Sequence, residues 1–331
     1  GWAWTRAILG VCSPEIHLCM SDDAEEIVKK LIEECGDTYE IVRHERNTKL
    51  IFENNTFDYP NDVRDNDALI VFSRKNVLSV ASELESKGFK VSILYGALPY
   101  TVRKSELHKF MTGETTILVS TDCIGMGINV PIERVVFLQT SKYDGIENRQ
   151  LNISEVKQIA GRAGRYGIYD VGYVNAIQDR KYIRRLLDSQ YHSIDLAKIN
   201  FPETLLNLDE KLSDTLITWS KITDKGIFVK TDVARDLMLC RYLEQFPLEK
   251  TQMLSLINMP FDERNDELLN MWRRFVKRFS NNTLVLKDEI KLMPLTDNLE
   301  SLELAHKKFD LVFSFMKAIQ STDEEVFNIV K

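Results

Sequence analysis

Long hydrophobic runs and paired cysteines are both missing from the sequence. No stretch of the 331 residues approaches the roughly 18 consecutive apolar residues that a membrane-spanning helix requires. The five cysteines include no Cys-x-x-Cys pair, which argues against a disulfide framework and against a zinc ribbon. Cys12, His17 and Cys19 lie close together, but lone thiols in apolar surroundings usually fill a core. We therefore predict no membrane contact and no metal site.

An excess of positive charge is lacking as well. The chain has 43 Lys and Arg residues against 50 Asp and Glu residues, which gives a net charge of -7. This balance argues against a protein that binds nucleic acid through a broad basic surface, although a narrow channel needs only local basic groups. The length leaves room for two modest domains, and the 44% hydrophobic content is that of an ordinary globular protein.

The sequence also contains no phosphate-binding loop of the form Gly-x-x-x-x-Gly-Lys-Ser/Thr and no Asp-Glu-x-His segment after a strand. In many ATPases such segments hold the triphosphate and its magnesium ion. A chain without them is not expected to hydrolyse ATP by itself.

The most informative segment that is present runs from Gln158 to Arg165, Gln-Ile-Ala-Gly-Arg-Ala-Gly-Arg. On a helix predicted over residues 154–165, Gln158, Arg162 and Arg165 share one face. The guanidinium donors suit the charge of a transferring phosphoryl group, and an amide can orient a water molecule. Two glycines cost a helix roughly 1 kcal/mol each, so we expect a close backbone approach there. A basic helix end with loose glycines is the alternative interpretation.

A second segment with phosphate-binding groups lies upstream. A buried strand is predicted over residues 116–120, and ligands in open α/β sheets collect where such strands end. Hydroxyl groups and backbone amides of the following loop, residues 121–131, are suited to phosphate oxygens, and an asparagine there is suited to a ribose. The residues concerned are Ser120, Thr121, Gly125, Gly127 and Asn129. A plain tight turn explains the Gly-x-Gly pattern equally well.

Together these two segments resemble motifs V and VI of superfamily 2 helicases. The sequences of the two segments are similar to those of the mitochondrial degradosome RNA helicase subunit and its bacterial relatives, the Suv3-like DExH-type family. Further resemblance lies in the opening Gly-Trp-Ala-Trp-Thr-Arg-Ala, in residues 68–76, which are similar to motif IV, and in residues 95–99. The likeness covers most of the chain and is weaker from Leu239 to the end.

The resemblance implies an ATP-dependent RNA helicase and a role for each matching residue. Arg165 corresponds to an arginine finger, Arg162 to a second clamp on the γ-phosphate, and Gln158 to the residue that orients the attacking water. Gly125, Gly127 and Asn129 correspond to nucleotide-binding residues. The expected RNA contacts are Ser73, Arg74, Ser120 and Thr121. ATP and Mg²⁺ are expected to be held mainly by a first RecA-like domain, of which residues 1 to about 20 resemble the tail.

The implied partner is RNA, either single-stranded or partly duplex, and possible further partners include an exoribonuclease. The implied location is the cytoplasm for a bacterial relative or the mitochondrial matrix. Two alternatives remain open: a DNA helicase with the same motor, because phosphate contacts carry little information about the sugar, and a non-catalytic scaffold subunit of an RNA-degrading complex.

The order of predicted elements indicates an α/β fold, a RecA-like parallel sheet with helices on both faces, followed by a mostly α-helical C-terminal domain. Asp22 and Glu25 predict a capping box for a helix over residues 24–35 that Gly36 ends. The predicted strands are 39–43, 69–73, 90–94, 116–120, 134–139 and 172–177, and the further helices are 76–87, 100–112, 154–165 and 180–189. We expect three regions: 1–36, the tail of the first RecA-like domain with a connecting helix; 37–190, the second RecA-like domain; and 191–331, the helical domain.

Two further segments carry hypotheses. Asp144-Gly145, within the insertion 140–153, predicts a two-residue hairpin turn, and we assign strand separation to Lys142, Tyr143 and Arg149, with a plain surface loop as the equal alternative. An amphipathic helix around Trp272, with Arg273, Arg274, Lys277 and Arg278 on its polar side, is predicted to be a core helix, with RNA contact as the less favoured interpretation. The tail from Leu302 to Val330 is expected to be helical.

Overall fold

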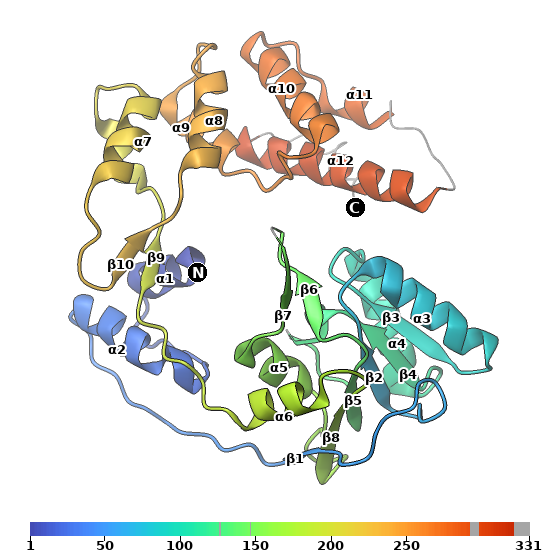
Figure 1. Cartoon of the computed structure of the whole chain (residues 1–331). Coiled ribbons are helices and arrows are strands. Elements are labelled where there is room, and N and C mark those ends of the chain that lie inside the picture. The colour runs from blue at the N-terminus through green and yellow to red at the C-terminus, as the bar shows by residue number, and fades with distance from the viewer. Residues whose placement is uncertain (126, 146, 292–297, 321–331) are drawn as a thin grey trace. The chain divides into compact units, whose positions relative to one another are not determined.

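The computed structural model describes residues 1–125, 127–145, 147–291 and 298–320, and the chain divides into two compact units (Figure 1). The α/β unit comprises residues 20–23 and 39–193. The helical unit comprises residues 1–19, 24–38 and 194–331. Residue 126 of the loop 121–131 and residues 321–330 of the expected C-terminal tail lie outside the described residues. The three-region division stays a prediction.

A parallel sheet forms the centre of the α/β unit. In the described residues it has six strands in the order β1-β8-β5-β2-β4-β3. β2, β4 and β5 are buried along their whole length, as expected of apolar runs in a parallel sheet covered on both faces. The strands are β1 (Lys49–Phe52), β2 (Asp67–Ile70), β3 (Val91–Leu94), β4 (Ile117–Ser120), β5 (Arg134–Phe137) and β8 (Val171–Ala176).

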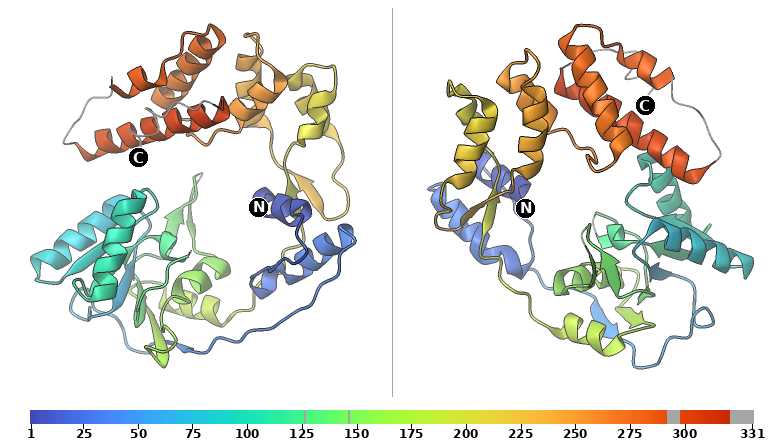
Figure 2. Two further views of the ribbon diagram at one scale, coloured as in Figure 1. Left: turned by 180° about the vertical axis from the view of Figure 1, so that it is seen from behind. Right: turned by 45° about the horizontal axis from the view of Figure 1, so that its top comes forward.

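The path of the chain explains why helices cover both faces of this sheet. The chain passes from β2 through α3 (Arg74–Ser86) to β3 and returns through α4 (Tyr100–Thr112) to β4. Right-handed crossovers in opposite directions place the two helices on opposite faces, as the front and back views show (Figures 1 and 2). α5 (Ile153–Ala160) and α6 (Arg180–Asp188) pack against each other beside β8. The predicted RecA-like α/β fold is confirmed.

In its described residues the second unit is mostly helical, as predicted, with one short parallel strand pair. Its largest fully buried side chains include Trp272, Phe275 and Phe315. Among the described residues, no helix has the length and apolar content needed to cross a membrane. The elements are α1 (Trp2–Gly10), α2 (Glu25–Glu34), β9 (Ala197–Ile199), α7 (Leu212–Lys221), β10 (Phe228–Lys230), α8 (Ala234–Leu243), α9 (Lys250–Ile257), α10 (Asp266–Ser280), α11 (Leu286–Lys291) and α12 (Leu299–Ala318).

Three predictions about where strands and helices begin or end are wrong. Residues 39–43 form no strand, and the edge strand is β1, because its Leu50 and Phe52 pack against the core while the earlier segment stays exposed. The helix predicted over 154–165 ends at Ala160, because the chain turns sharply at the glycines that follow. The capping box at Asp22 is absent, since a short 3-10 turn delays the start of α2 and Ala24 becomes its N-cap.

Candidate functional site

The loop that follows β4 is the first part of the site. It begins with a 3-10 turn, η2 (Asp122–Gly125), which Thr121 caps by accepting a hydrogen bond at its hydroxyl from the Cys123 amide at 3.4 Å. Gly127 has a φ of +66°, a left-handed conformation that favours glycine. Asn129 is exposed just beyond it. We call residues 121–130 the site loop.

A turn rich in glycine follows α5, and we call residues 161–165 the glycine turn. A Cβ at Gly164, where φ is +76°, would lie 2.6 Å from the Gly172 backbone nitrogen and 2.6 Å from Thr48 Cγ2. A Cβ at Gly172 would lie 2.6 Å from the carbonyl carbon of Ala163. No side chain fits such distances without a shift of backbone, so the close approach expected from the sequence is confirmed.

Arg46 holds the glycine turn from outside, and the sequence reasoning did not identify it. Its Nε donates to the Thr48 carbonyl at 2.7 Å, and its guanidinium also donates to the carbonyls of Gly161, at 3.0 Å, and Ala163. Burial lowers the pKa of this guanidinium. Backbone carbonyls near a helix end are strong acceptors for a cation, so Arg46 stabilises a turn that has left the helical hydrogen-bond pattern.

Arg162 joins the glycine turn to the site loop. Its guanidinium donates to the Ile128 carbonyl at 2.9 Å and to the Gly125 carbonyl. Burial lowers the pKa of Arg162, although a guanidinium stays charged at any physiological pH. The Arg162 side chain therefore fixes the distance between the glycine turn and the site loop.

Arg165 and Gln158 lie beside the same loop with more exposure to solvent. Arg165 is half-buried, and among the described residues the only hydrogen bond of its side chain is a long one, 3.5 Å, to the Asn129 carbonyl. Gln158 is exposed on α5, and its Cβ is 3.5 Å from where a Cβ at Gly125 would be. Across the described part of the chain, neither Arg162 nor Arg165 forms an ion pair. The shared helix face predicted for the three residues is wrong, because α5 ends before the arginines, yet the fold brings all three to the site loop.

The predicted RNA-contact residues gather where β2 and β4 end, since these neighbouring strands pair Ile70 with Ser120. Ser73 is exposed and caps α3, accepting a hydrogen bond from the Asn76 amide at 3.1 Å, and the half-buried Arg74 follows it. Thr121 is 8% exposed. Ser120 is 0% exposed and donates its hydroxyl to the Thr121 carbonyl, so burial argues against this residue as a phosphate ligand.

The insertion between the two motif segments is a hairpin, as predicted. β6 (Ser141–Tyr143) pairs antiparallel with β7 (Asn148–Gln150), and Tyr143 is 63% exposed. The predicted two-residue turn is wrong. Tyr143 pairs with Asn148, which leaves a four-residue connection in which the Asp144 amide donates to the Glu147 carbonyl at 3.1 Å.

The cations of this hairpin are held by carboxylates. Lys142 Nζ lies 2.8 Å from Asp122 of the site loop and 2.7 Å from Glu155 of α5, and Arg149 contacts Glu155 at 2.9 Å. Burial opposes ionisation of Glu155, but hydrogen bonds from Arg149, Lys142 and the Asn152 amide outweigh it and lower its pKa to about 2. Asn152 and Glu155 also form the capping box of α5, an Asn-x-x-Glu pattern that sequence reasoning missed. Glu155 thus links the hairpin to α5, and Lys142 links the hairpin to the site loop.

The basic side of α10 in the helical unit is also occupied. Arg274 and Arg278 both pair with Glu289, which is 3% exposed, and the Arg273 guanidinium lies 5.4 Å from the ring centre of Tyr242. The opposite face is core, with Trp272 fully buried. These contacts favour the core-helix interpretation of this segment over RNA contact.

The lone thiols near the N-terminus are not core residues. Cys12 and Cys19 are both exposed, so the prediction that they fill a core is wrong. In the segments that the structure describes, no group of three or more His, Cys, Asp or Glu side chains is arranged to hold a metal ion.

Two family models match segments of this chain. Residues 48–167 match the helicase conserved C-terminal domain, and residues 1–44 match the DEXQ-box helicase domain of Suv3. The α/β unit therefore contains a helicase C-terminal domain. With the relatives described next, these matches make the chain similar to the Suv3-like helicases of superfamily 2.

Three similar curated proteins are each longer than this chain. "ATP-dependent RNA helicase SUV3, mitochondrial" of Candida albicans is 38% identical over 205 residues, 60% of this chain and 28% of that protein. The Saccharomyces cerevisiae protein of the same name is 33% identical over 256 residues, 68% of this chain and 35% of that protein. "DExH-box ATP-dependent RNA helicase DExH16, mitochondrial" of Arabidopsis thaliana is 28% identical over 94% of this chain and 58% of that protein. The chain thus spans roughly a quarter to three fifths of their lengths.

Proposed function

We propose that this chain supplies the second half of the ATP site and part of the RNA track of an ATP-dependent RNA helicase. One observation carries the proposal: Arg162 ties the glycine turn to the site loop through the Ile128 and Gly125 carbonyls, while Arg165 remains half-exposed beside Asn129. Among the described residues, Arg165 has no carboxylate partner, and the close glycine contacts fix its backbone. Such a cation is suited to bind a phosphate that a neighbouring domain supplies.

The donor groups around the site loop fit a triphosphate. Arg165 stabilises charge on the transferring phosphoryl group, and Gln158 orients the attacking water. Arg162 positions the loop and keeps part of its guanidinium for a second phosphate contact. Gly125, Gly127 and Asn129 provide the backbone and the amide that face the nucleotide. ATP with Mg²⁺, held mainly by a first RecA-like domain, supplies the phosphoryl group and the free energy of its transfer.

The RNA track is proposed to cross the carboxyl edge of β2 and β4, where Ser73, Arg74 and Thr121 lie. Phosphate contacts at a strand edge fix the position of a strand without reading its sequence. Because Thr121 begins the site loop that Arg162 holds, movement at the nucleotide is transmitted to the RNA contact over one short segment. The matched relatives carry mitochondrial names, and we propose the mitochondrial matrix as the location, with an exoribonuclease as a partner.

The decisive experiment is Arg165→Ala in the full-length protein. An arginine finger contributes on the order of a thousandfold or more to turnover, so we expect RNA-stimulated ATP hydrolysis to fall by that factor while ATP binding is retained. Lys104→Ala, which removes one exposed cation of the same unit, is the matched control and should leave turnover unchanged. Near-normal turnover of the Arg165 variant would refute the assignment.

Two further outcomes separate the alternatives. Stimulation of ATP hydrolysis by DNA as strong as by RNA of equal length would favour a DNA helicase, because only contacts to the 2′-hydroxyl distinguish the two. A wild-type full-length protein that fails to hydrolyse ATP would favour a scaffold subunit.

A further inference from the structure

Helix α6 of the α/β unit carries a cluster of cations that the proposed function does not use. The inner side of the helix is held in place. Ile183 and Leu186 are buried, and Arg180 donates to the carbonyls of Glu53, at 2.7 Å, and Asn55. Asp179 starts the helix and accepts a hydrogen bond from the Thr140 hydroxyl at 2.7 Å. α6 is therefore a rigid support for the side chains on its outer side.

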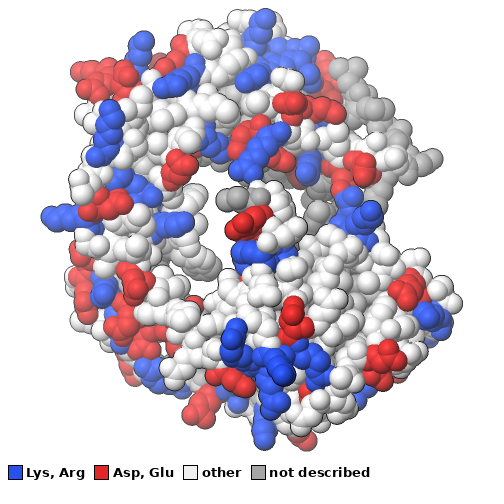
Figure 3. All heavy atoms as spheres, viewed as in Figure 1, with Lys and Arg blue, Asp and Glu red and all other residues white. Residues whose placement is uncertain are grey.

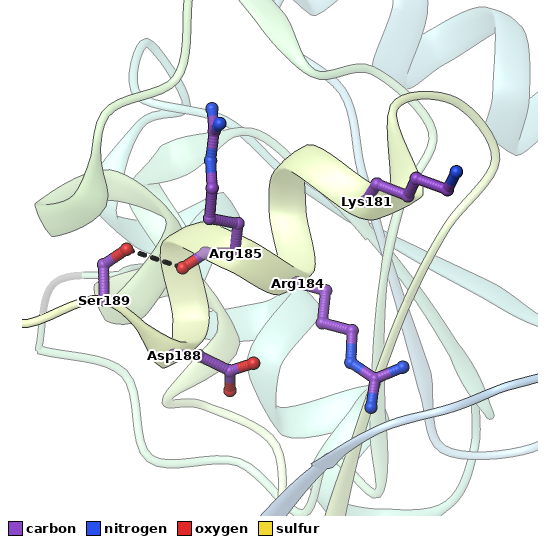
Figure 4. Close-up of a pocket in the computed structure, with 5 residues that line it drawn as sticks. All are labelled: Lys181, Arg184, Arg185, Asp188 and Ser189. Carbon is purple, nitrogen blue, oxygen red and sulfur yellow. Dashed lines mark hydrogen bonds between the residues drawn. The ribbon is translucent and has the colours of Figure 1, made fainter.

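The outer side of α6 presents Lys181, Arg184 and Arg185, all exposed, which we call the α6 basic face. Figure 3 shows Lys and Arg gathered over this part of the molecule. These residues line a shallow hollow together with Asp188 and Ser189, and their side chains fan out along the helix (Figure 4). Ser189 donates its hydroxyl to the Arg185 carbonyl at 2.7 Å. The lining thus holds three cations against the single carboxylate of Asp188.

The contacts of these three cations differ from those of the other basic clusters. Lys142, Arg149, Arg274 and Arg278 pair with carboxylates. Among the residues that the structure describes, Lys181, Arg184 and Arg185 form no ion pair. Arg184 donates to the Asn54 side-chain oxygen at 3.2 Å, and Arg185 lies over the Tyr182 ring, 5.3 Å from its centre. Lys181 and Arg185 are four residues apart on one helix, an arrangement of like charges that destabilises a helix unless an anion lies between them.

We propose that the α6 basic face is an additional contact surface for the phosphate backbone of RNA, an inference that rests on the proposed function. The three cations are spread along the helix. This spacing suits a polymer, in which a different phosphate can contact each cation, better than it suits a single compact anion. Two of the three are arginines, whose planar donors bind phosphate oxygens in pairs. In a chain of net charge -7, such a local cluster attracts a polyanion without making the whole surface basic.

The test measures binding of this chain to a fluorescein-labelled single-stranded RNA by anisotropy over a series of salt concentrations. The triple variant Lys181→Ala, Arg184→Ala, Arg185→Ala is compared with Lys87→Ala, Lys90→Ala, Lys104→Ala. The control removes three exposed cations of the same unit and changes the net charge equally. Far-ultraviolet circular dichroism and thermal melting verify that both variants fold.

Each phosphate contact contributes roughly 0.7 to the slope of log affinity against log salt for a single strand, so we expect the α6 variant to lose about 2 units of slope. Its affinity at low salt should fall about tenfold or more, and the control should keep both values. Equal losses in both variants would overturn the proposal, as would an unchanged α6 variant. Loss of binding to polyglutamate with RNA binding retained would also overturn it and would indicate an acidic protein partner.

Failure here is distinguishable from failure of the proposed function. In the full-length protein at saturating RNA, the α6 variant should retain ATP turnover, whereas Arg165→Ala should not. If the wild-type chain does not bind RNA at all, the α6 proposal is overturned, while the nucleotide assignment is still decided by the Arg165 measurement.

Discussion

The glycine turn of the α/β unit and helix α10 of the helical unit both carry closely spaced arginines but differ in what those arginines contact. Arg162 and Arg165 meet backbone carbonyls of the site loop. Arg274 and Arg278 meet the buried carboxylate of Glu289. A cation neutralised inside its own unit has little left to offer a ligand, so the contacts of a basic segment, more than its charge, separate a site from a structural helix.

The largest expected effect tests whether the glycine turn is fixed by backbone contacts. Gly164→Ala should destabilise the α/β unit by about 2–5 kcal/mol, because a left-handed φ and a Cβ 2.6 Å from the Gly172 backbone add strain to overpacking. Gly167→Ala is the control: its φ is +81°, but no atom lies within 4 Å of a Cβ, so only about 1–2 kcal/mol is expected. Urea unfolding measures both, and equal losses would contradict the close approach.

The second prediction tests the other side of the comparison. Glu289→Gln should destabilise the helical unit by about 1–3 kcal/mol, because two guanidiniums lose a buried counter-charge while their own half-exposure limits the loss. Glu267→Gln, which breaks the exposed pair with Lys308, should change stability by about 0.5 kcal/mol or less. Thermal unfolding compares them. A Glu289 variant as stable as the control would mean that α10 is not neutralised as described.

The third prediction uses the pKa of Glu155. Its folded pKa of about 2 lies below the ordinary value near 4.5, so its ion pairs stabilise the fold above pH 4.5 and are lost as the pH falls toward 2. Wild type should exceed Glu155→Gln in stability by about 1–2 kcal/mol at pH 7, since solvent screening of the partly exposed Arg149 reduces the full effect. The gap in melting temperature should narrow as the pH falls below 4.5 and close only near pH 2. A gap that does not change with pH would refute the role of the charge.

The smallest expected effect concerns thiol chemistry in the two units. Burial and the nearby Glu244 raise the pKa of Cys240 in the helical core to about 12, whereas Cys12 and Cys35 are exposed and Cys123 in the site loop is partly buried. Because the thiolate is the reactive form, maleimide labelling at pH 7.5 should modify the exposed thiols first, Cys123 next and Cys240 only on unfolding. Peptide mapping by mass spectrometry gives the order, and early labelling of Cys240 would show an open core.

Sequence patterns predicted those parts of the structure that depend on neighbouring residues. The β-branched run before Ser120 predicted β4, and the bounds of α4 were predicted correctly, because apolar periodicity and breakers act locally. The glycine pattern predicted a close approach but not the end of α5. The turn depends on contact with Gly172, in the next strand, and on Arg46, which lies more than a hundred residues before it. Likewise, no sequence pattern indicates that Glu289 neutralises α10 or that Lys142 faces Glu155, because each pair joins two different elements and forms only when those elements pack together.

The parallel pairing of β1 with β8 has a practical consequence for shortening this protein. A truncation that starts at Asp67 would keep every motif segment but remove β1, which covers β8 along four residues, and Arg46, which holds the glycine turn. Without that cover, the largely buried strand β8 would become a free edge, a template for pairing with other chains. Any minimal version of the α/β unit should therefore begin before Arg46.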